Sequence, residues 1–226
     1  LLVGWLLAAL RGQPPYPVLV LGGEEGSGKS SLAMECRRLV DPSATPLSQL
    51  PKNDQDLFIR ANNSYILAFD NLSSIAEAQS DSLCRISTGG GISTRKLYTD
   101  DEEANVSVAR PIIVNGIGEI ATRQDLLSRS LVLSLPPLDS GKSESEFWRE
   151  FDGAAPRILG ALLDAMVLGL RDIDSVRATT GIRLIDITRF MTAAEPALVW
   201  NVGTFEGAYR KNQLESVLRS VEASPF

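Results

Sequence analysis

The chain of 226 residues is 44% hydrophobic and 22% charged, and its formal net charge is −6. It is long enough to bury a full core, and its acidic balance argues against a broad surface that coats nucleic acid, while leaving room for a local basic patch. Histidine is absent, which excludes His-based acid–base catalysis and His–metal sites. The two cysteines, Cys36 and Cys84, are too few and too far apart for a zinc site or a disulfide scaffold, so we expect buried thiols in a reducing, cytoplasmic compartment.

The first predicted element is an apolar helix over residues 1–10, which is too short to span a bilayer. No basic region precedes this stretch and no convincing cleavage site follows it, so we expect a helix that packs on the core and no membrane association. Because the chain starts at Leu1 and not at methionine, we expect a processed N-terminus or, preferably, a piece of a longer polypeptide.

The second stretch is a glycine-rich turn between a short apolar strand and a helix that is expected to reach Val40. Residues 23–30 match the pattern G-x-x-x-x-G-K-[ST] at every fixed position. Glycines in this pattern let successive backbone N–H groups surround a phosphate, and the helix directs its positive end at the same anion. The lysine reaches the β- and γ-phosphates and the serine hydroxyl ligates Mg²⁺, so the stretch predicts a site for a nucleoside triphosphate, taken as ATP. The residues expected to contact it are Gly23, Glu24, Glu25, Gly26, Ser27, Gly28, Lys29, Ser30 and Ser31.

Three further apolar runs are typical of strands buried on both faces of a parallel sheet. They lie at residues 65–69, 111–115 and 131–135. The segment before the first run predicts a helix over 54–62, and the segments between the runs predict helices over 73–87 and 122–127 and a hairpin-like excursion over 92–109.

Beyond about residue 140 the pattern predicts helices only. Residues 145–172 carry apolar side chains at near-helical spacing, and Pro156 is expected to divide them into two helices. Two or more helices are expected over residues 185–221. We therefore predict an α/β nucleotide-binding core with a parallel sheet over residues 1–138 and a C-terminal helical subdomain over residues 139–226.

Three polar residues next to the predicted strands suit ATP chemistry. Asp70 ends one strand, where a carboxylate can hold Mg²⁺ through water or, alternatively, cap a helix or turn. Asn115 ends the next strand and can hydrogen-bond the γ-phosphate or the attacking water, or merely cap a turn. Arg129 precedes the last strand and can point into the nucleotide site of a neighbouring subunit, or remain a solvated surface residue.

These features together resemble AAA+ ATPases, and most closely the superfamily 3 helicases of phages, plasmids and integrated elements, which are often fused to a primase. Residues 23–30 correspond to the Walker A motif of that family, Asp70 to its Walker B aspartate and Asn115 to its sensor-1 asparagine. Arg129 occupies the place of its arginine finger. Residues 88–98 resemble its region that runs into a hairpin facing the central channel of a ring.

The resemblance covers about residues 10–138 and implies a P-loop NTPase (AAA+-like) fold, ATP hydrolysis with Mg²⁺ and a homo-oligomeric ring. Lys29 would share the catalytic role with Asp70, Asn115 and, across the subunit interface, Arg129. Ser30 and Asp70 would hold the metal. Arg95 and Lys96 would contact the phosphate backbone of DNA, which positions a strand without reading its sequence.

One position departs from the family pattern. The family usually carries a second acidic residue directly after the Walker B aspartate, where it polarises the attacking water, and this chain has Asn71 there. An amide orients water but cannot accept its proton, so hydrolysis is expected to be slow or to use another carboxylate. Glu25 is the nearest candidate in sequence, although it is equally well explained as an exposed loop residue.

The leading hypothesis is an ATP-hydrolysing DNA helicase or translocase domain of a mobile-element replication protein. The alternative is a P-loop module that binds nucleotide and changes conformation without unwinding anything, which Asn71 and the acidic net charge favour. A small-molecule kinase is a weaker third hypothesis, because no second basic cluster offers a site for an acceptor phosphate.

Overall fold

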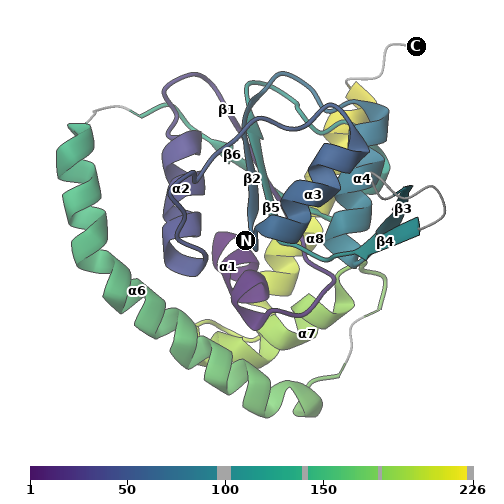
Figure 1. Ribbon diagram of the computed structural model, residues 1–226. Helices are drawn as coiled ribbons and strands as arrows, with labels where there is room; N and C mark the ends of the chain where they lie inside the picture. Colours follow the sequence, from purple (N-terminus) through teal and green to yellow (C-terminus); the bar gives the residue numbers. More distant parts are fainter. Residues whose placement is uncertain (96–102, 139–141, 178–179, 223–226) are drawn as a thin grey trace.

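The computed structural model describes residues 1–95, 103–138, 142–177 and 180–222 (Figure 1). Its elements up to the last strand are α1 (Leu2–Arg11), β1 (Val18–Gly23), α2 (Lys29–Val40), α3 (Asp54–Asn63), β2 (Leu67–Leu72), α4 (Glu77–Thr88), β3 (Gly91–Arg95), β4 (Glu103–Ser107), β5 (Ile112–Gly116), α5 (Gln124–Leu127) and β6 (Ser130–Leu135). The elements that follow are α6 (Glu144–Asp172), α7 (Ile185–Ala194) and α8 (Thr204–Glu222), with 3-10 turns at Ile173–Ser175 and Glu195–Leu198.

Four strands form one parallel sheet in the order β2-β5-β1-β6. Strand β5 therefore separates the strand that carries Asp70 from the strand that leads into the glycine-rich loop. Leu21 of β1 pairs with Asn115, and Phe69 of β2 pairs with Val114. Because all four strands are parallel, their carboxyl ends meet at one edge, where ligands bind in open α/β sheets.

The two faces of the sheet are covered by different helices, as Figure 1 shows. Leu19 and Leu21 belong to the core cluster that includes residues of α1, α2, α6, α7 and α8, whereas Val18 and Val20 belong to the cluster on the opposite face with α3, α4 and α5. Successive side chains of a strand point to opposite faces, so strands covered on both sides are apolar throughout. Burial on both faces of the sheet therefore explains the continuous apolar runs in the sequence.

The C-terminal helices pack directly on the core. Leu162 and Phe190 share one buried cluster with Trp5 of α1. A Cβ added to Gly4 would lie 2.2 Å from the ring of Phe205, so α1 and α8 approach closely only because residue 4 is glycine. The predicted division of the chain at residue 138 stays a prediction.

Side chains of helix α8 hydrogen-bond to the backbone of β6, the last strand on one side of the sheet. The Asn212 side chain brackets Val132 of β6, accepting from its N–H at 2.9 Å and donating to its carbonyl at 2.6 Å. The Gln213 amide donates to the Ser130 carbonyl at 2.9 Å. An edge strand presents unpaired backbone groups that would otherwise pair with another chain, and here the side chains of a helix occupy them.

Helix α6 is continuous, so the prediction that Pro156 divides it was wrong. Proline fits the helical φ angle and removes only one N–H donor. Contacts on both sides of it hold the helix together, because Phe151 is buried before Pro156 and Leu162 and Met166 are buried after it. Figure 1 shows the helix as a long curved arm along α2 towards α7.

Two predicted boundaries also differ from the structure. The strand predicted at 65–69 runs instead from Leu67 to Leu72, so that Asp70 and Asn71 lie inside it. The helix predicted from residue 73 begins at Glu77. Both differences in boundary lie at the carboxyl end of β2, next to Asp70 and Asn71.

Among the described residues, one helical stretch, Glu144–Ser175, is long and apolar enough to cross a membrane by length and composition. Core helices of proteins outside membranes pass the same test, so the feature is weak evidence for a span. In this structure the stretch packs on α1 and α7 through its buried residues.

Candidate nucleotide site

The loop between β1 and α2 has the backbone that its glycines permit. Gly26 and Gly28 have φ angles of 77° and 78°, in the left-handed region that residues with a Cβ rarely adopt. Gly23 has a φ of 149°, and a Cβ there would lie 2.6 Å from the Leu135 carbonyl. Helix α2 begins directly after Gly28, so its N-terminal end faces the space that the loop encloses.

Lys29 folds back on this loop. Its ammonium donates to the carbonyls of Gly23 at 2.9 Å and Glu24 at 2.6 Å, and to the Ser27 hydroxyl at 3.2 Å. These three acceptors match the three donors of an ammonium group. The side chain is 9% exposed and is therefore held at the base of the loop, within the motif that predicts phosphate binding.

Ser30 and Asp70 meet although 40 residues separate them in sequence. The Ser30 hydroxyl donates to Asp70 Oδ1 at 2.9 Å. Two neighbouring ligands of an octahedral Mg²⁺ ion lie about 3 Å apart, given metal–oxygen distances of about 2.1 Å. This pair of oxygens therefore fits two adjacent positions around Mg²⁺. Within the described parts of the chain, no group of three or more Asp, Glu, Cys or His residues could hold a metal, so a cation here would take its other ligands from phosphate and water.

Asn71 and Asn115 lie next to Asp70, at the carboxyl ends of β2 and β5. Strand β2 changes register between Phe69 and Leu72, and Asn71 there adopts a left-handed φ of 58°. Its backbone N–H donates to Asp70 Oδ1 at 2.8 Å and to Asn115 Oδ1 at 3.1 Å. The Asn115 side chain is 1% exposed and its Nδ2 has no hydrogen-bond partner in the described structure.

These residues line one cavity of about 500 Å³. A buried amide that donates no hydrogen bond is costly, so the free Nδ2 of Asn115 indicates a missing acceptor. The lining residues are Glu25, Gly26, Ser27, Gly28, Lys29, Ser30, Ser31, Asp70, Asn71, Asn115, Gly116 and Ile117.

The structure thus brings most of the predicted site together. Gly23 and Glu24 do not line this cavity, and their carbonyls hold Lys29 instead. Gly116 and Ile117 line it without having been predicted, and their only signal in the sequence is that they follow Asn115. A Cβ on Gly116 would lie 2.0 Å from the Leu72 carbonyl, so the close approach of β5 to β2 requires glycine.

Arg129 lies at the other end of the sheet. Its carbonyl accepts from the N–H of Val18, the first residue of β1, so about 16 Å of strand separates it from the glycine-rich loop. Its guanidinium donates to the carboxylate and carbonyl of Asp125 and contacts Cys84 Sγ at 3.9 Å. The side chain is 15% exposed and its Nε has no partner in the described structure. Within one subunit Arg129 therefore does not reach the cavity.

The pKa values of Asp125 and Cys84, which contact Arg129, are shifted, and so is that of Cys36 on α2. The hydrogen bond from Arg129 holds the pKa of the Asp125 carboxyl below its usual range. Burial raises the pKa of the Cys84 thiol to about 11 and that of the Cys36 thiol to about 12. Both cysteines are free and buried, as predicted, and both stay protonated at neutral pH.

The predicted DNA-contacting segment includes an antiparallel hairpin. Strands β3 and β4 pair from Gly91 with Ser107 to Arg95 with Glu103, and Figure 1 shows them projecting beyond α4, away from α2. Arg95 ends β3, whereas Lys96 lies outside the described residues.

Comparison with known proteins adds to this geometry. The family described as actinomycete integrative conjugative element replication protein matches residues 1–212. The chain belongs to this family. It is thus a replication protein of a mobile element, as the resemblance implied, with a helicase-like fold. A search of curated proteins found no match.

Solved structures with the same fold include a helicase. A structure titled "SCCmec type IV Cch - active helicase" has a TM-score of 0.54 and 12% identity, covering 97% of this chain and 48% of that one. The apo C-terminal region of NrS-1 has a TM-score of 0.50 and 14% identity, covering 71% of this chain and 40% of that one. At these identities the likeness shows the fold, and it confirms the α/β P-loop class and the resemblance to helicase domains. The chain spans about half the length of the first of these structures.

Proposed function

We propose that this chain is an ATP-hydrolysing motor domain that acts on DNA during replication of the integrated element. Mg-ATP would occupy the 500 Å³ cavity, and subunits would assemble into a ring in the cytoplasm. The observation that carries the proposal is the buried Asn115 amide, which lacks an acceptor at the cavity that also holds Lys29 and the Ser30–Asp70 pair.

Each residue of the site has a distinct role in this proposal. A phosphate would replace the loop carbonyls and the Ser27 hydroxyl as the partner of the Lys29 ammonium. Ser30 and Asp70 would hold Mg²⁺, which when bound neutralises charge on the β- and γ-phosphates. Asn115 would donate from Nδ2 to the γ-phosphate or to the attacking water. Arg129 would act on the cavity of a neighbouring subunit, since it cannot reach its own.

Contact with DNA would come from the β3–β4 hairpin through Arg95 and Lys96. Basic side chains on a projecting hairpin bind backbone phosphate and release counterions, so the contact would depend on salt. The alternative is an ordinary exposed hairpin, in which the acidic run at residues 100–103 balances these charges.

ATP turnover with and without single-stranded DNA tests the proposal. We expect Lys29→Ala to lower turnover at saturating Mg-ATP by about 100-fold or more, because it removes a charge that faces the phosphates. Lys211→Ala is the matched control, since Lys211 is an exposed lysine of α8. Parent-like turnover by Lys29→Ala would refute the assignment of the loop.

The same turnover assay, together with DNA affinity measured against salt concentration, tests the hairpin. Replacing Arg95 and Lys96 by alanine should abolish stimulation by DNA and flatten the slope of log affinity against log salt by up to about two. Equal slopes and equal stimulation would show that the hairpin is ordinary surface.

A switch that binds nucleotide without moving DNA is the second candidate. Asn71 favours it, because an amide lines the cavity at the position where a carboxylate would take a proton from water. Tight Mg-ATP binding together with turnover that DNA does not stimulate would support the switch over the motor.

A further inference from the structure

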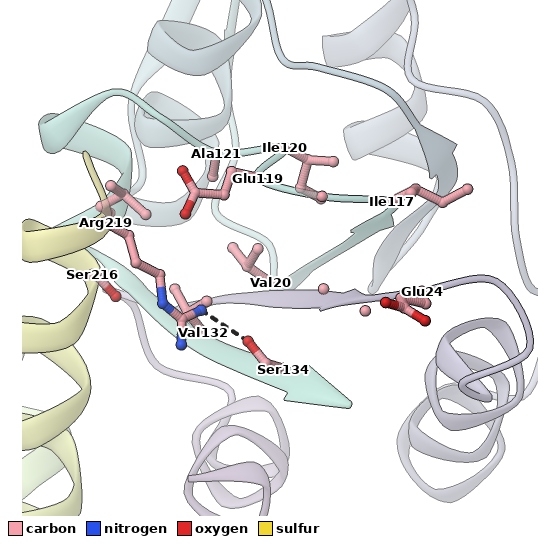
Figure 2. Close-up of a pocket in the computed structure, with 14 residues that line it drawn as sticks. Val20, Glu24, Ile117, Glu119, Ile120, Ala121, Val132, Ser134, Ser216 and Arg219 are labelled. Atoms are coloured by element: carbon pink, nitrogen blue, oxygen red, sulfur yellow. Dashed lines mark hydrogen bonds between the residues drawn. The ribbon is translucent and has the colours of Figure 1, made fainter. Parts of the chain in front are cut away.

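A second cavity, of about 400 Å³, lies beside the nucleotide site on the opposite side of the glycine-rich loop. Figure 2 shows β1 and β6 forming its floor, with Val20 and Val132 pointing into it, and the segment Ile117–Ala121 forming the opposite wall. Arg219 and Ser216 of α8 close one side. The volume and the mainly apolar lining are those of small-molecule sites.

The shape of this cavity favours a flat ligand. One wall is a face of the sheet and the other is the segment Ile117–Ala121, so the ligand space is a slot between two walls. Val20, Ile120 and Leu127 are each less than 7% exposed, and the slot therefore reaches the buried core cluster. Aromatic rings suit such apolar slots because they bury a large area with few rotatable bonds.

Polar side chains line the cavity at two ends, with Glu119, Ser216 and Arg219 at one end and Glu24 at the other. The Arg219 guanidinium donates to the Ser134 hydroxyl at 2.9 Å, which positions it, and most of its five donors are not used in that bond. Figure 2 shows the Glu119 carboxylate at the same end of the cavity. The edge of a ligand at this end of the cavity would meet the Arg219 guanidinium as a donor and the Glu119 carboxylate as an acceptor.

We propose that this cavity binds a one- or two-ring heteroaromatic compound whose edge carries an N–H donor beside an acceptor, as nucleobases do. The rings would lie between Val20 and Val132 on one side and the Ile117–Ala121 segment on the other. The N–H would donate to Glu119, and the neighbouring acceptor would receive a hydrogen bond from Arg219. The proposal does not rest on ATP binding, although Ile117 borders both cavities.

Inosine is a suitable probe, because its base has an N–H beside a carbonyl and it carries no phosphate for the glycine-rich loop. Purine riboside is the matched control ligand, since it lacks that N–H and that carbonyl. Titration of the chain, followed by calorimetry or NMR, should show inosine binding at least about tenfold tighter than purine riboside, because purine riboside cannot make the two hydrogen bonds to Glu119 and Arg219.

Variants locate the site. Arg219→Ala and Glu119→Ala should each weaken inosine binding about tenfold or more, whereas Lys211→Ala, on the same helix and away from the cavity, should not change it. Both replaced side chains are exposed, so the fold should survive. Ser30→Ala should leave inosine binding unchanged, because Ser30 lines the nucleotide cavity and not this one, and its hydroxyl bonds to Asp70.

Three results would overturn the proposal: no binding of inosine at millimolar concentration, equal binding of purine riboside, or loss of inosine binding in Ser30→Ala. The last result would place the base in the nucleotide cavity. Failure of ATP hydrolysis alone would refute the proposed motor and leave this cavity unaffected.

Discussion

Asn71 combines a left-handed backbone with a neutral side chain at the edge of the nucleotide cavity. Asparagine and aspartate tolerate this backbone better than most residues with a Cβ. The backbone N–H of Asn71 joins the Asp70 and Asn115 side chains, so residue 71 helps to position both. Its side chain is exposed and free to be changed without disturbing those bonds.

We predict that Asn71→Asp raises the rate of ATP hydrolysis by about tenfold or more. Aspartate keeps the shape and the tolerance for a left-handed φ, and it adds a carboxylate that can take a proton from water, an effect worth about 10²–10⁴ in rate where the geometry is right. Single-turnover hydrolysis with Mg-ATP measures the change, with Asn71→Ala as the control that removes the amide without adding a base. A rate for Asn71→Asp at or below that of the parent would show that another group already activates the water.

At the scale of the elements, α6 is the helix whose continuity depends on tertiary contacts. Pro156 removes one helical hydrogen bond, yet the helix is anchored on both sides of it. Before the proline, the Arg38 guanidinium stacks 3.9 Å from the ring centroid of Trp148 and pairs with Asp152 at 2.9 Å. After the proline, a Cβ on Gly169 would lie 2.6 Å from the Phe190 ring, so α6 and α7 pack closely there.

We predict that Pro156→Ala raises the free energy of unfolding by about 1–3 kcal/mol, because it restores a backbone hydrogen bond in a helix interior. Urea unfolding followed by circular dichroism measures this. Gly160→Ala is the control, since a Cβ there meets nothing within 4 Å and should stabilise the helix by about 1 kcal/mol. A Pro156→Ala chain less stable than the parent would show that the curvature of α6 is needed for its contacts with α2 and α7.

At the scale of the whole molecule, the two ends of the parallel sheet have different chemistry. The carboxyl ends of the strands hold Lys29, Ser30, Asp70 and Asn115, and the opposite end holds Arg129. An arginine at that end can act on ATP only in another subunit. In the single subunit its guanidinium is paired with Asp125, so assembly would have to exchange that partner for phosphate.

We predict that Arg129→Ala and Lys29→Ala subunits partly restore each other's ATPase activity when mixed. Each variant alone lacks one half of a site formed between subunits, whereas a mixed interface can combine an intact cavity with an intact arginine. Turnover of mixtures at varied ratios, with assembly verified by light scattering, provides the measurement. No recovery in a verified mixed oligomer would mean that Arg129 acts only within its own fold, as a partner of Asp125.

The sequence by itself determined the local chemistry of this protein. The glycine-rich pattern at residues 23–30 predicts a loop with left-handed glycines, and the structure has them at Gly26 and Gly28. The apolar runs predict strands buried on both faces, and polar residues at their ends predict a shared edge. These inferences succeed because backbone sterics and burial act on neighbouring residues, which a linear sequence displays directly.

Only the tertiary structure decided which distant residues meet. The order β2-β5-β1-β6 places Asn115 between the strands of Asp70 and the loop, and nothing in the periodicity of the strands specifies that order. The register shift at Asn71, the continuity of α6 through Pro156 and the pairing of Arg129 with Asp125 likewise depend on contacts between segments far apart in the chain. Packing free energy overrides local preference at such positions, because it is summed over partners that the sequence does not show side by side.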